Sequence, residues 1–371
     1  MSNNKYWIWL GNVAGLGHVK LKQLLESYET AENIYNLTAS QIDDIPGIND
    51  KLKLSLKNKG LDYVEGIIED CRVKGIDIIT ITDEKYPKKL AYIYDPPIVL
   101  YKKGKDFCYD ELASIAIVGT RKATPYGLAT AENFARDLSL NGMTVISGMA
   151  EGVDSAAHKG AIKAGCPTIA ILGTGVDICY PRFNQELYEY IINYGAVISE
   201  YPPGTGAHPG HFPARNRIIS GISEATLVVE ADLKSGSLIT ADMANDQGKD
   251  VFAIPNNINA PKARGTNQLI KEFAYMATCV SDILEHYLIK YPEQLYQKPE
   301  KKISDAEYEK AVNNLSDDEK SVIECLSEKP IYIDEILRKT KLPAGKVNGL
   351  LVILQMKDVV YLLPGNSYML K

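Results

Sequence analysis

The chain has 371 residues, of which 45% are hydrophobic and 24% charged, and its formal net charge is −6. This length allows two or three domains with cores of their own, and the composition excludes a disordered or fibrous protein. The acidic total does not exclude nucleic acid as a ligand, because binding to phosphates depends on where the basic side chains cluster. The start of the chain, MSNNKYWIWLGNVAGLG, lacks the pattern of a signal peptide, and no apolar run is long enough to cross a membrane, so we expect a cytoplasmic protein.

The cysteines and histidines do not form a recognisable set of metal ligands. The six cysteines are scattered and include no C-x-x-C pair, which argues against a disulfide framework and against a zinc site. Of the five histidines only His208 and His211 lie close together, and two ligands on an irregular loop do not define a metal geometry. We therefore predict no metal and no cofactor.

Residues 1–70 contain two hydrophobic-glycine turns, AGLG at 14–17 and IPGI at 45–48, between apolar-periodic segments. This is the pattern of paired helix-hairpin-helix units, in which the N–H groups of the turn can meet a DNA phosphate. Such glycine turns are also common connectors that only close a small helical domain. We expect a helical, helix-hairpin-helix or SAM-like domain over residues 1–70. Residues 71–112, with short β-rich stretches broken by prolines, are expected to form a connecting segment that leads into the core.

Residues 113–290 alternate apolar runs of four to six residues with helical segments. Continuous apolar strands separated by helices predict a Rossmann-like, doubly wound, mostly parallel sheet with helices on both faces, which is an α/β fold. The first helix is well defined, because Thr124 can cap it, Pro125 suits its first position, and the asparagine-glycine pair at 141–142 ends it. The predicted strands are SIAIV, TVIS, TIAIL, AVIS, ATLVVE and VFAIP, and the predicted helices lie at 125–140, near 154–164, near 185–192, after Asn216, near Ala241 and after Thr266.

The C-terminal part of the sequence predicts a linker and a small separate module. Residues 291–315 are polar, contain proline and are rich in lysine and glutamate, as is typical of a linker. Ser316 and Glu319 form a capping box for the first of three helices, and a hairpin with a Pro-Gly-Asn-Ser turn follows, so residues 316–371 are predicted to be a winged-helix domain. Its third helix offers only Lys346 and Lys357 as cations, which favours contact with protein or a second copy over sequence-specific repression.

The loops that follow the predicted strands carry the candidate site, since ligands of doubly wound sheets bind beyond the carboxyl ends of the strands. Glycines allow a close backbone approach, N–H groups at helix starts attract anions, and the planar donor fork of arginine matches phosphate oxygens. Pairing of the arginines with Asp154, Glu230 or Asp232 is the alternative interpretation. The predicted phosphate-binding residues are Gly119, Thr120, Arg121, Lys122, Ser147, Gly148, Arg215, Asn216, Arg217, Ser235, Gly236 and Ser237.

The same loops contain no pattern for covalent catalysis or nucleotide hydrolysis. None matches the P-loop G-x-x-x-x-G-K-[ST], and the Gly-Thr-Gly at 173–175 lacks the third glycine of a dinucleotide fingerprint. No G-x-S-x-G elbow occurs, and neither Ser147 nor Ser237 has a recognisable base. His158 follows Asp154 by four residues on one helix face, a spacing typical of a local cap and packing pair. We therefore expect a protein without catalytic residues.

An ordered series of motifs resembles the DNA-processing protein A family (DprA, also called Smf) over nearly the whole chain. The resemblance implies a protein that binds and protects single-stranded DNA, helps to load the RecA recombinase in natural transformation or recombination, forms a homodimer and has no enzymatic activity. It places DNA phosphates on the loops identified above. The chain departs from the family where Asn256 replaces the usual glycine after Ile-Pro. The motifs are YPKKLAYIYDPPIVLYKKG, IAIVGTRKATPYG, VISGMAEGVDSAAHKGAIKAG, TIAILGTGVDICYP, ISEYPPG, FPARNRIISGISEATLVVEA, SGSLITA and GTNQLI.

A nucleotide-binding or phosphoribohydrolase-like enzyme on the same Rossmann core is the alternative. The lysine-decarboxylase-like phosphoribohydrolases resemble this core and carry the signature P-G-G-x-G-T-x-x-E. In this chain the corresponding loop is SGSLITA, without the catalytic glutamate. The chemistry of the site, rather than the fold, therefore favours DNA binding.

Overall fold

The structure is a computed structural model that describes residues 4–295, 315–327, 331–356, 359–363 and 367–370. It consists of two compact units, which are described separately. No helix in the described ranges is long and apolar enough to span a bilayer. The first unit contains Met1–Ser139 and Thr144–Met276, and the second contains Leu140–Met143 and Ala277–Lys371.

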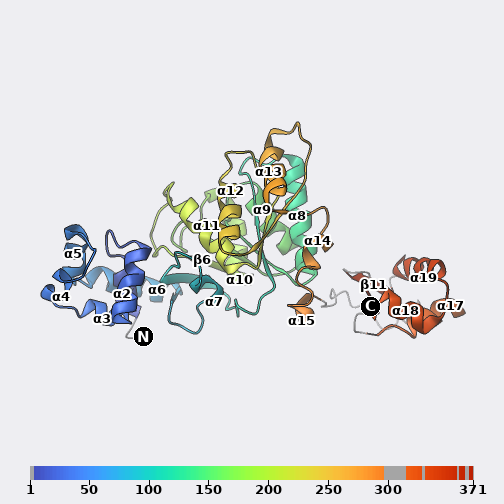
Figure 1. Cartoon of the computed structure of the whole chain (residues 1–371), viewed down its shortest axis with the longest axis horizontal. Coiled ribbons are helices and arrows are strands. Elements are labelled where there is room, and N and C mark those ends of the chain that lie inside the picture. The colour runs from blue at the N-terminus through green and yellow to red at the C-terminus, as the bar shows by residue number, and fades with distance from the viewer. Residues whose placement is uncertain (1–3, 296–314, 328–330, 357–358, 364–366, 371) are drawn as a thin grey trace. The chain divides into compact units, whose positions relative to one another are not determined.

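Short helices fill the start of the first unit (Figure 1, blue). The predicted glycine turns connect α1 to α2 and α4 to α5. Gly15 (φ 84°) and Gly47 (φ 73°) have left-handed backbone angles, which explains why both turns use glycine. The apolar sides of the helices are buried around Trp7 and Leu24. The helices are α1 (Asn4–Gly11), α2 (His18–Tyr28), α3 (Ala31–Tyr35), α4 (Ala39–Asp43), α5 (Asp50–Lys57) and α6 (Asp62–Lys74).

A large mixed sheet follows, with the strand order β1-β2-β6-β5-β4-β3-β7-β8-β9. From β3 onward neighbouring strands are parallel, as the apolar runs predict. The expected connecting segment contributes β1 and β2, which join the edge at β6 in antiparallel pairs. The strands are β1 (Asp77–Thr80), β2 (Val99–Gly104), β3 (Ser114–Val118), β4 (Thr144–Ser147), β5 (Thr168–Ile171), β6 (Ala196–Ser199), β7 (Ala225–Val228), β8 (Asp250–Ala253) and β9 (Tyr275–Met276).

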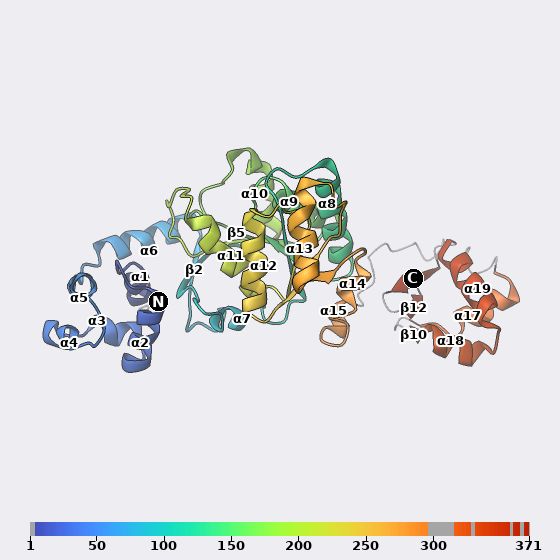
Figure 2. The ribbon, with the colours of Figure 1, turned by 45° about the horizontal axis from the view of Figure 1, so that its top comes forward.

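Helices pack against both faces of this sheet. Ile169 of β5 belongs to a hydrophobic cluster with residues of α11, α12 and α13, which lie next to one another (Figure 2). Its neighbour Ala170 points to the other face and clusters with Ile191 of α10. The sequence thus forms the doubly wound core that its apolar runs predict. The helices are α7 (Lys88–Ala91), α8 (Pro125–Leu140), α9 (Val153–Lys163), α10 (Gln185–Tyr194), α11 (His211–Ile222), α12 (Gly236–Asp246) and α13 (Arg264–Glu272).

Helix α11 differs from the prediction in its starting point. It begins at His211 rather than after Asn216. Pro213 lies in its first turn, where backbone N–H groups have no partner within the helix, so proline is tolerated there. Arg215 and Arg217 therefore lie inside a helix, and not in the loop before it. By contrast, α8 covers the predicted range 125–140.

The second unit contains the predicted three helices and small sheet. The capping box of Ser316 and Glu319 is present at the start of α17. The strands pair antiparallel in the order β10-β12-β11, which gives the winged-helix arrangement. Residues 296–314 of the predicted linker, 364–366 of the hairpin turn and Lys357 lie outside the described residues. The elements are α14 (Ser281–Leu284), α15 (Pro292–Leu295), α17 (Asp317–Ile323), β10 (Ile331–Tyr332), α18 (Ile333–Thr340), α19 (Ala344–Met356), β11 (Val360–Leu363) and β12 (Ser367–Leu370).

Candidate nucleic-acid interface

A cavity of about 950 Å³ opens at the carboxyl ends of β3 and β7. The chain order reverses between these two strands, because β4, β5 and β6 lie on one side of β3, and β7 and β8 lie on the other. This is the switch point at which doubly wound sheets bind ligands, and the volume lies within the usual range of ligand sites. The predicted residues that line the cavity are Gly119, Thr120, Arg121, Lys122, Arg215, Asn216, Ser235, Gly236 and Ser237.

Three of the predicted residues do not line the cavity. Ser147 is fully buried, and its Oγ donates a hydrogen bond to the carbonyl oxygen of Ile117 at 2.7 Å, so its side chain joins neighbouring strands. Gly148 lines a smaller adjoining pocket of about 70 Å³. Arg217 lies elsewhere, and both ends of its guanidinium donate to Glu200, at 2.7 and 2.6 Å. The sequence suggested carboxylate pairing of the arginines, but with other carboxylates.

Arg215 forms the floor of the cavity and is only 3% exposed. Its Nη1 donates to the carbonyl oxygens of Gly148 (2.8 Å) and Ile171, and its Nε donates to the side chain of Asn216 (3.2 Å). Nη2 has no hydrogen-bond acceptor among the residues that the structure describes. Burial lowers the pKa of Arg215 to about 10, with Asp154 acting in the opposite direction, so the group remains a cation at neutral pH.

Gly148 is required by this close packing. A Cβ atom at this position would lie 2.5 to 2.6 Å from the guanidinium atoms of Arg215. Such a contact is far inside van der Waals distance, so any larger residue would displace the arginine. The glycine therefore positions the buried cation rather than a phosphate directly.

Asp154 lines the cavity although the sequence suggested it only as an arginine partner and as a local packing partner of His158. It lies in the first turn of α9, lines the cavity, and accepts a hydrogen bond from the N–H group of Gly148 at 3.2 Å. Burial raises the pKa of its carboxyl to about 6, although the charge of Arg215 lowers it. A carboxylate thus already occupies the backbone donors that the sequence assigned to phosphate.

The helix starts around the cavity differ in what they can bind. At α8, the carboxylate of Glu230 accepts hydrogen bonds from the N–H (2.8 Å) and the Oγ (2.5 Å) of Thr124. At α12, the Oγ of Ser235 caps the helix, and Gly236 next to it is exposed with open space beyond its Cα. Because the carboxylate of Glu230 occupies the start of α8, and that of Asp154 lies beside the start of α9 and accepts from the loop before it, α12 offers the open anion position.

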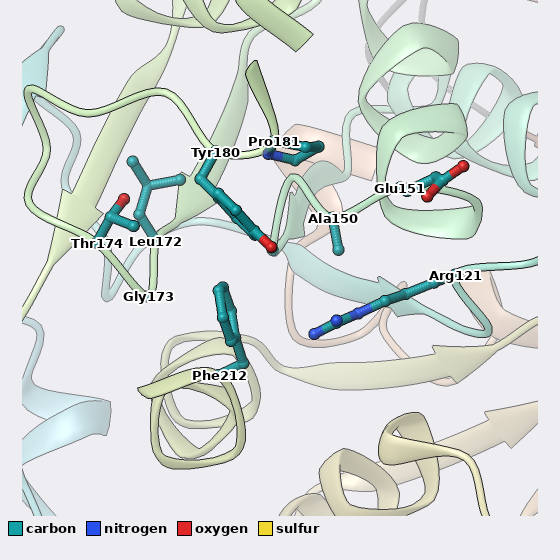
Figure 3. Close-up of a pocket in the computed structure, with 10 residues that line it drawn as sticks. Arg121, Ala150, Glu151, Leu172, Gly173, Thr174, Tyr180, Pro181 and Phe212 are labelled. Carbon is teal, nitrogen blue, oxygen red and sulfur yellow. The ribbon is translucent and has the colours of Figure 1, made fainter. Parts of the chain in front are cut away.

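Two aromatic side chains that the sequence did not identify, Tyr180 and Phe212, line both the cavity and the small adjoining pocket, which is drawn in Figure 3. The rings of Tyr180 and Phe212 lie 5.3 Å apart between centroids, and the guanidinium of Arg121 lies 5.2 Å from the Phe212 centroid. Lys262 also lines the cavity, and its ammonium donates to the carbonyl oxygen of Lys122. Phe212 stands three residues before Arg215 in the same motif, which is the signal that could have identified it.

The core of the chain, residues 77–288, matches the family model of DNA recombination-mediator protein A, and residues 306–366 match that of the DprA winged helix domain. The chain belongs to the DNA recombination-mediator protein A family. This membership confirms the resemblance seen in the motifs. It also confirms the predicted fold class, a Rossmann-like α/β core with a winged-helix domain.

Relatives in this family match the chain over most of their length. Protein Smf of Synechocystis sp. is 32% identical, over 99% of this chain and 98% of its own. The crystal structure of DNA processing protein A (DprA) from Streptococcus pneumoniae is 35% identical with a TM-score of 0.65, covering 76% of this chain and 97% of its own. DNA processing protein A from Helicobacter pylori, solved for its single-stranded DNA binding mode, is 32% identical with a TM-score of 0.53, covering 58% and 97%.

The site brings together cations, hydroxyl groups and aromatic rings. In the described part of the chain no cluster of three or more histidine, cysteine, aspartate or glutamate side chains could hold a metal ion. Ser235 and Ser237 bond to each other, with their hydroxyl oxygens 2.8 Å apart. What this DprA-family site can do is hold an anion at α12 and Arg215 and a flat apolar group at its aromatic edge.

Proposed function

We propose that this chain binds single-stranded DNA, with backbone phosphates in the cavity and unpaired bases against its aromatic edge. One observation supports the phosphate position above all. Arg215 is buried at the floor of the cavity, and its Nη2 donors have no acceptor within the described residues. A buried charged group with unused donors is unfavourable unless an anion completes its hydrogen bonds. A phosphate between Arg215 and the open start of α12 would do this.

The aromatic edge favours a single strand over a duplex. Base faces are covered in a duplex but free in a single strand, and stacking on aromatic rings contributes about 1–3 kcal/mol per base. Tyr180, Phe212 and Arg121 form a partly exposed set of flat groups beside the cations. The single-stranded DNA binding described for the Helicobacter pylori relative agrees with this preference.

The wider role proposed for the chain follows from its family. It protects incoming single-stranded DNA, promotes loading of RecA recombinase in transformation or recombination, acts as a homodimer in the cytoplasm, and has no catalytic step or cofactor. Within this proposal the domains remain 1–70, 71–112, 113–290, 291–315 and 316–371. Nine of the twelve predicted residues line the cavity and are proposed to meet the phosphates, whereas Ser147, Gly148 and Arg217 are not proposed as direct phosphate contacts.

Fluorescence anisotropy with labelled oligo-dT tests the proposal. We expect the full chain to bind oligo-dT more tightly than a duplex of equal length, and Arg121→Ala to weaken binding at least tenfold. Arg136→Ala is the control, because Arg136 is a partly exposed arginine on α8 that is paired with Asp137 and does not line the cavity. Equal affinity of wild type and Arg121→Ala would refute the cavity as the DNA site. Release of free base from nucleoside monophosphates would favour the enzyme alternative instead.

A further inference from the structure

A phenylalanine stands exposed on the turn beside the cavity. The 3-10 turn Arg182–Asn184 follows directly on Tyr180 and Pro181, which line the small pocket (Figure 3). Phe183 in this turn is 68% exposed. A phenylalanine ring has no polar atom, so its exposure forgoes the favourable free energy of burial without any hydrogen bond in return. A single exposed apolar side chain is ordinary on a protein surface, so the case depends on how the ring is held and what surrounds it.

The turn that carries Phe183 is firmly anchored. The neighbouring Asn184 is buried, and its amide donates to the carbonyl oxygen of Met149 (3.0 Å) and to the Oγ of Ser155 (2.8 Å). These acceptors belong to the loop after β4 and to α9, which also carry the cavity wall. The backbone N–H of Asn184 closes the turn onto Pro181 at 3.0 Å. The phenylalanine ring is therefore presented from a fixed support next to the site, which reduces the entropy lost when a ligand stacks on it.

The charges on this side of the molecule limit where a strand can run. Arg182 is exposed, and no hydrogen bond or ion pair engages it in the part of the chain that the structure describes. Glu186 and Glu189 are exposed on α10 immediately beyond the turn. A phosphate is therefore attracted to the turn and repelled from the helix that follows it. The three residue steps from Tyr180 to Phe183 span at most about 11 Å, the length of roughly three stacked nucleotides.

We propose that Phe183 is a base-stacking platform outside the cavity, which takes an unpaired base of the strand as it leaves the pocket past Tyr180. Arg182 contacts the phosphate of that nucleotide. The carboxylates at the start of α10 keep the DNA strand from continuing along that helix. The proposal rests on the single-stranded DNA binding proposed above and adds to the DNA track a residue that the motifs of the family did not identify.

A length series of oligo-dT, from about four to about sixteen nucleotides, tests the platform by fluorescence anisotropy with the full chain. For the wild type we expect a step in affinity at the length that reaches Phe183. Phe183→Ala should bind the shortest oligonucleotides like wild type and bind the longer ones about fivefold more weakly. This factor corresponds to about 1 kcal/mol, the lower end of the stacking energy per base, as expected at an exposed site. Tyr92→Ala is the matched control and should bind like wild type, because Tyr92 is also exposed (87%) but lies on the loop after α7.

Two further variants separate stacking from simple apolar contact. Phe183→Leu keeps an apolar side chain without a ring and should lose the step. Phe183→Trp should keep it, and its fluorescence should be quenched by the longer oligonucleotides, while Trp7 and Trp9, buried among the N-terminal helices, give no such change. Normal binding at every length by Phe183→Ala, or full affinity of Phe183→Leu, would overturn the platform alone. Absence of wild-type binding at all lengths would refute the cavity proposal, and the platform with it.

Discussion

The carboxyl of Asp154 should make DNA binding depend on pH. It lies buried in the cavity that we assign to phosphate, next to the charge of Arg215, and its pKa is raised by burial to about 6. A bound phosphate adds negative charge nearby and raises this pKa further, so the complex holds more protons than the free protein. By linkage, the affinity for DNA must then rise as pH falls. The rise begins at the pKa of the complex, which lies above 6, and is complete near pH 6, the pKa of the free protein. The variant Asp154→Asn has no ionisable group at this position and should lose the dependence.

The expected size follows from Coulomb's law. Two unit charges on either side of a guanidinium lie roughly 8 Å apart, and at an effective dielectric constant of about 20 they repel by about 2 kcal/mol. That energy corresponds to about thirtyfold in affinity between the protonated and ionised forms of Asp154. The variant Asp154→Asn should therefore bind oligo-dT at pH 8 roughly as tightly as the wild type binds it below pH 6.

The raised pKa of Asp154 also makes the free energy of unfolding depend on pH, independently of DNA binding. The folded-state pKa of Asp154 is about 6 and the ordinary value is 3.8, so the folded protein binds more protons between these values. The protonated carboxyl of Asp154 therefore stabilises the folded protein by about 3 kcal/mol below about pH 4. This contribution to the free energy of unfolding is lost as pH rises through about 6. In the Asp154→Asn variant this loss is absent, which urea unfolding at several pH values would measure.

The assay is anisotropy with labelled oligo-dT between pH 5 and pH 8 at constant salt, for wild type, Asp154→Asn and the control Asp137→Asn. Asp137 is a half-exposed carboxylate on α8 that pairs with Arg136, so its variant should follow the wild type. A wild-type affinity that is flat across this range, or parallel curves for wild type and Asp154→Asn, would refute the reasoning.

Three other variants address the supports of the site. Arg217→Ala should lower the free energy of unfolding in urea by about 3 kcal/mol, because it leaves the carboxylate of Glu200 without its guanidinium partner; a loss below about 1 kcal/mol would contradict a stabilising role for this pair. Gly148→Ala should weaken oligo-dT binding at least tenfold while circular dichroism shows a folded protein, since the added Cβ displaces Arg215; unchanged affinity would show that the guanidinium does not need its observed position. Arg121→Ala should reduce the slope of log affinity against log salt by about 0.7, the value for one phosphate contact on a single strand, whereas an unchanged slope would mean that Arg121 meets no phosphate.

The location of the site follows from sequence because parallel topology brings loops together. The apolar runs of β3, β4, β5 and β7 are each followed by a loop that contains glycine, and in a parallel sheet those ends share one edge, so Gly119 and Ser235 line one cavity although they are distant in sequence. The boundaries of α8 were equally predictable, because Pro125 at its first position and the glycine after its last turn are local signals. Such features need no knowledge of side-chain packing.

The roles of individual arginines could not be read in the same way. Residues two apart on a helix point about 200° apart, so once α11 begins at His211, Arg215 and Arg217 must face nearly opposite sides. With the helix start placed after Asn216, both would belong to an irregular loop and could face the cavity together. The missed first turn therefore accounts for the inclusion of Arg217 among the direct phosphate contacts. Asp154 presents the same difficulty, since its burial depends on the packing of α9 against the sheet.

The acidic total of the chain is compatible with an anionic ligand because of what its carboxylates do near the site. Glu200 is held by a guanidinium, Glu230 accepts hydrogen bonds at a helix start, and Asp154 accepts one from a glycine N–H. Carboxylates bonded in this way are buried or neutralised locally and present little free charge at the mouth of the cavity. Arg121 and Lys122 remain exposed there, with no carboxylate partner in the described residues. Together with Lys262 they outnumber Asp232, an exposed carboxylate in the same lining, so the local potential favours DNA, and a net charge of −6 over the whole chain opposes it only weakly at physiological salt.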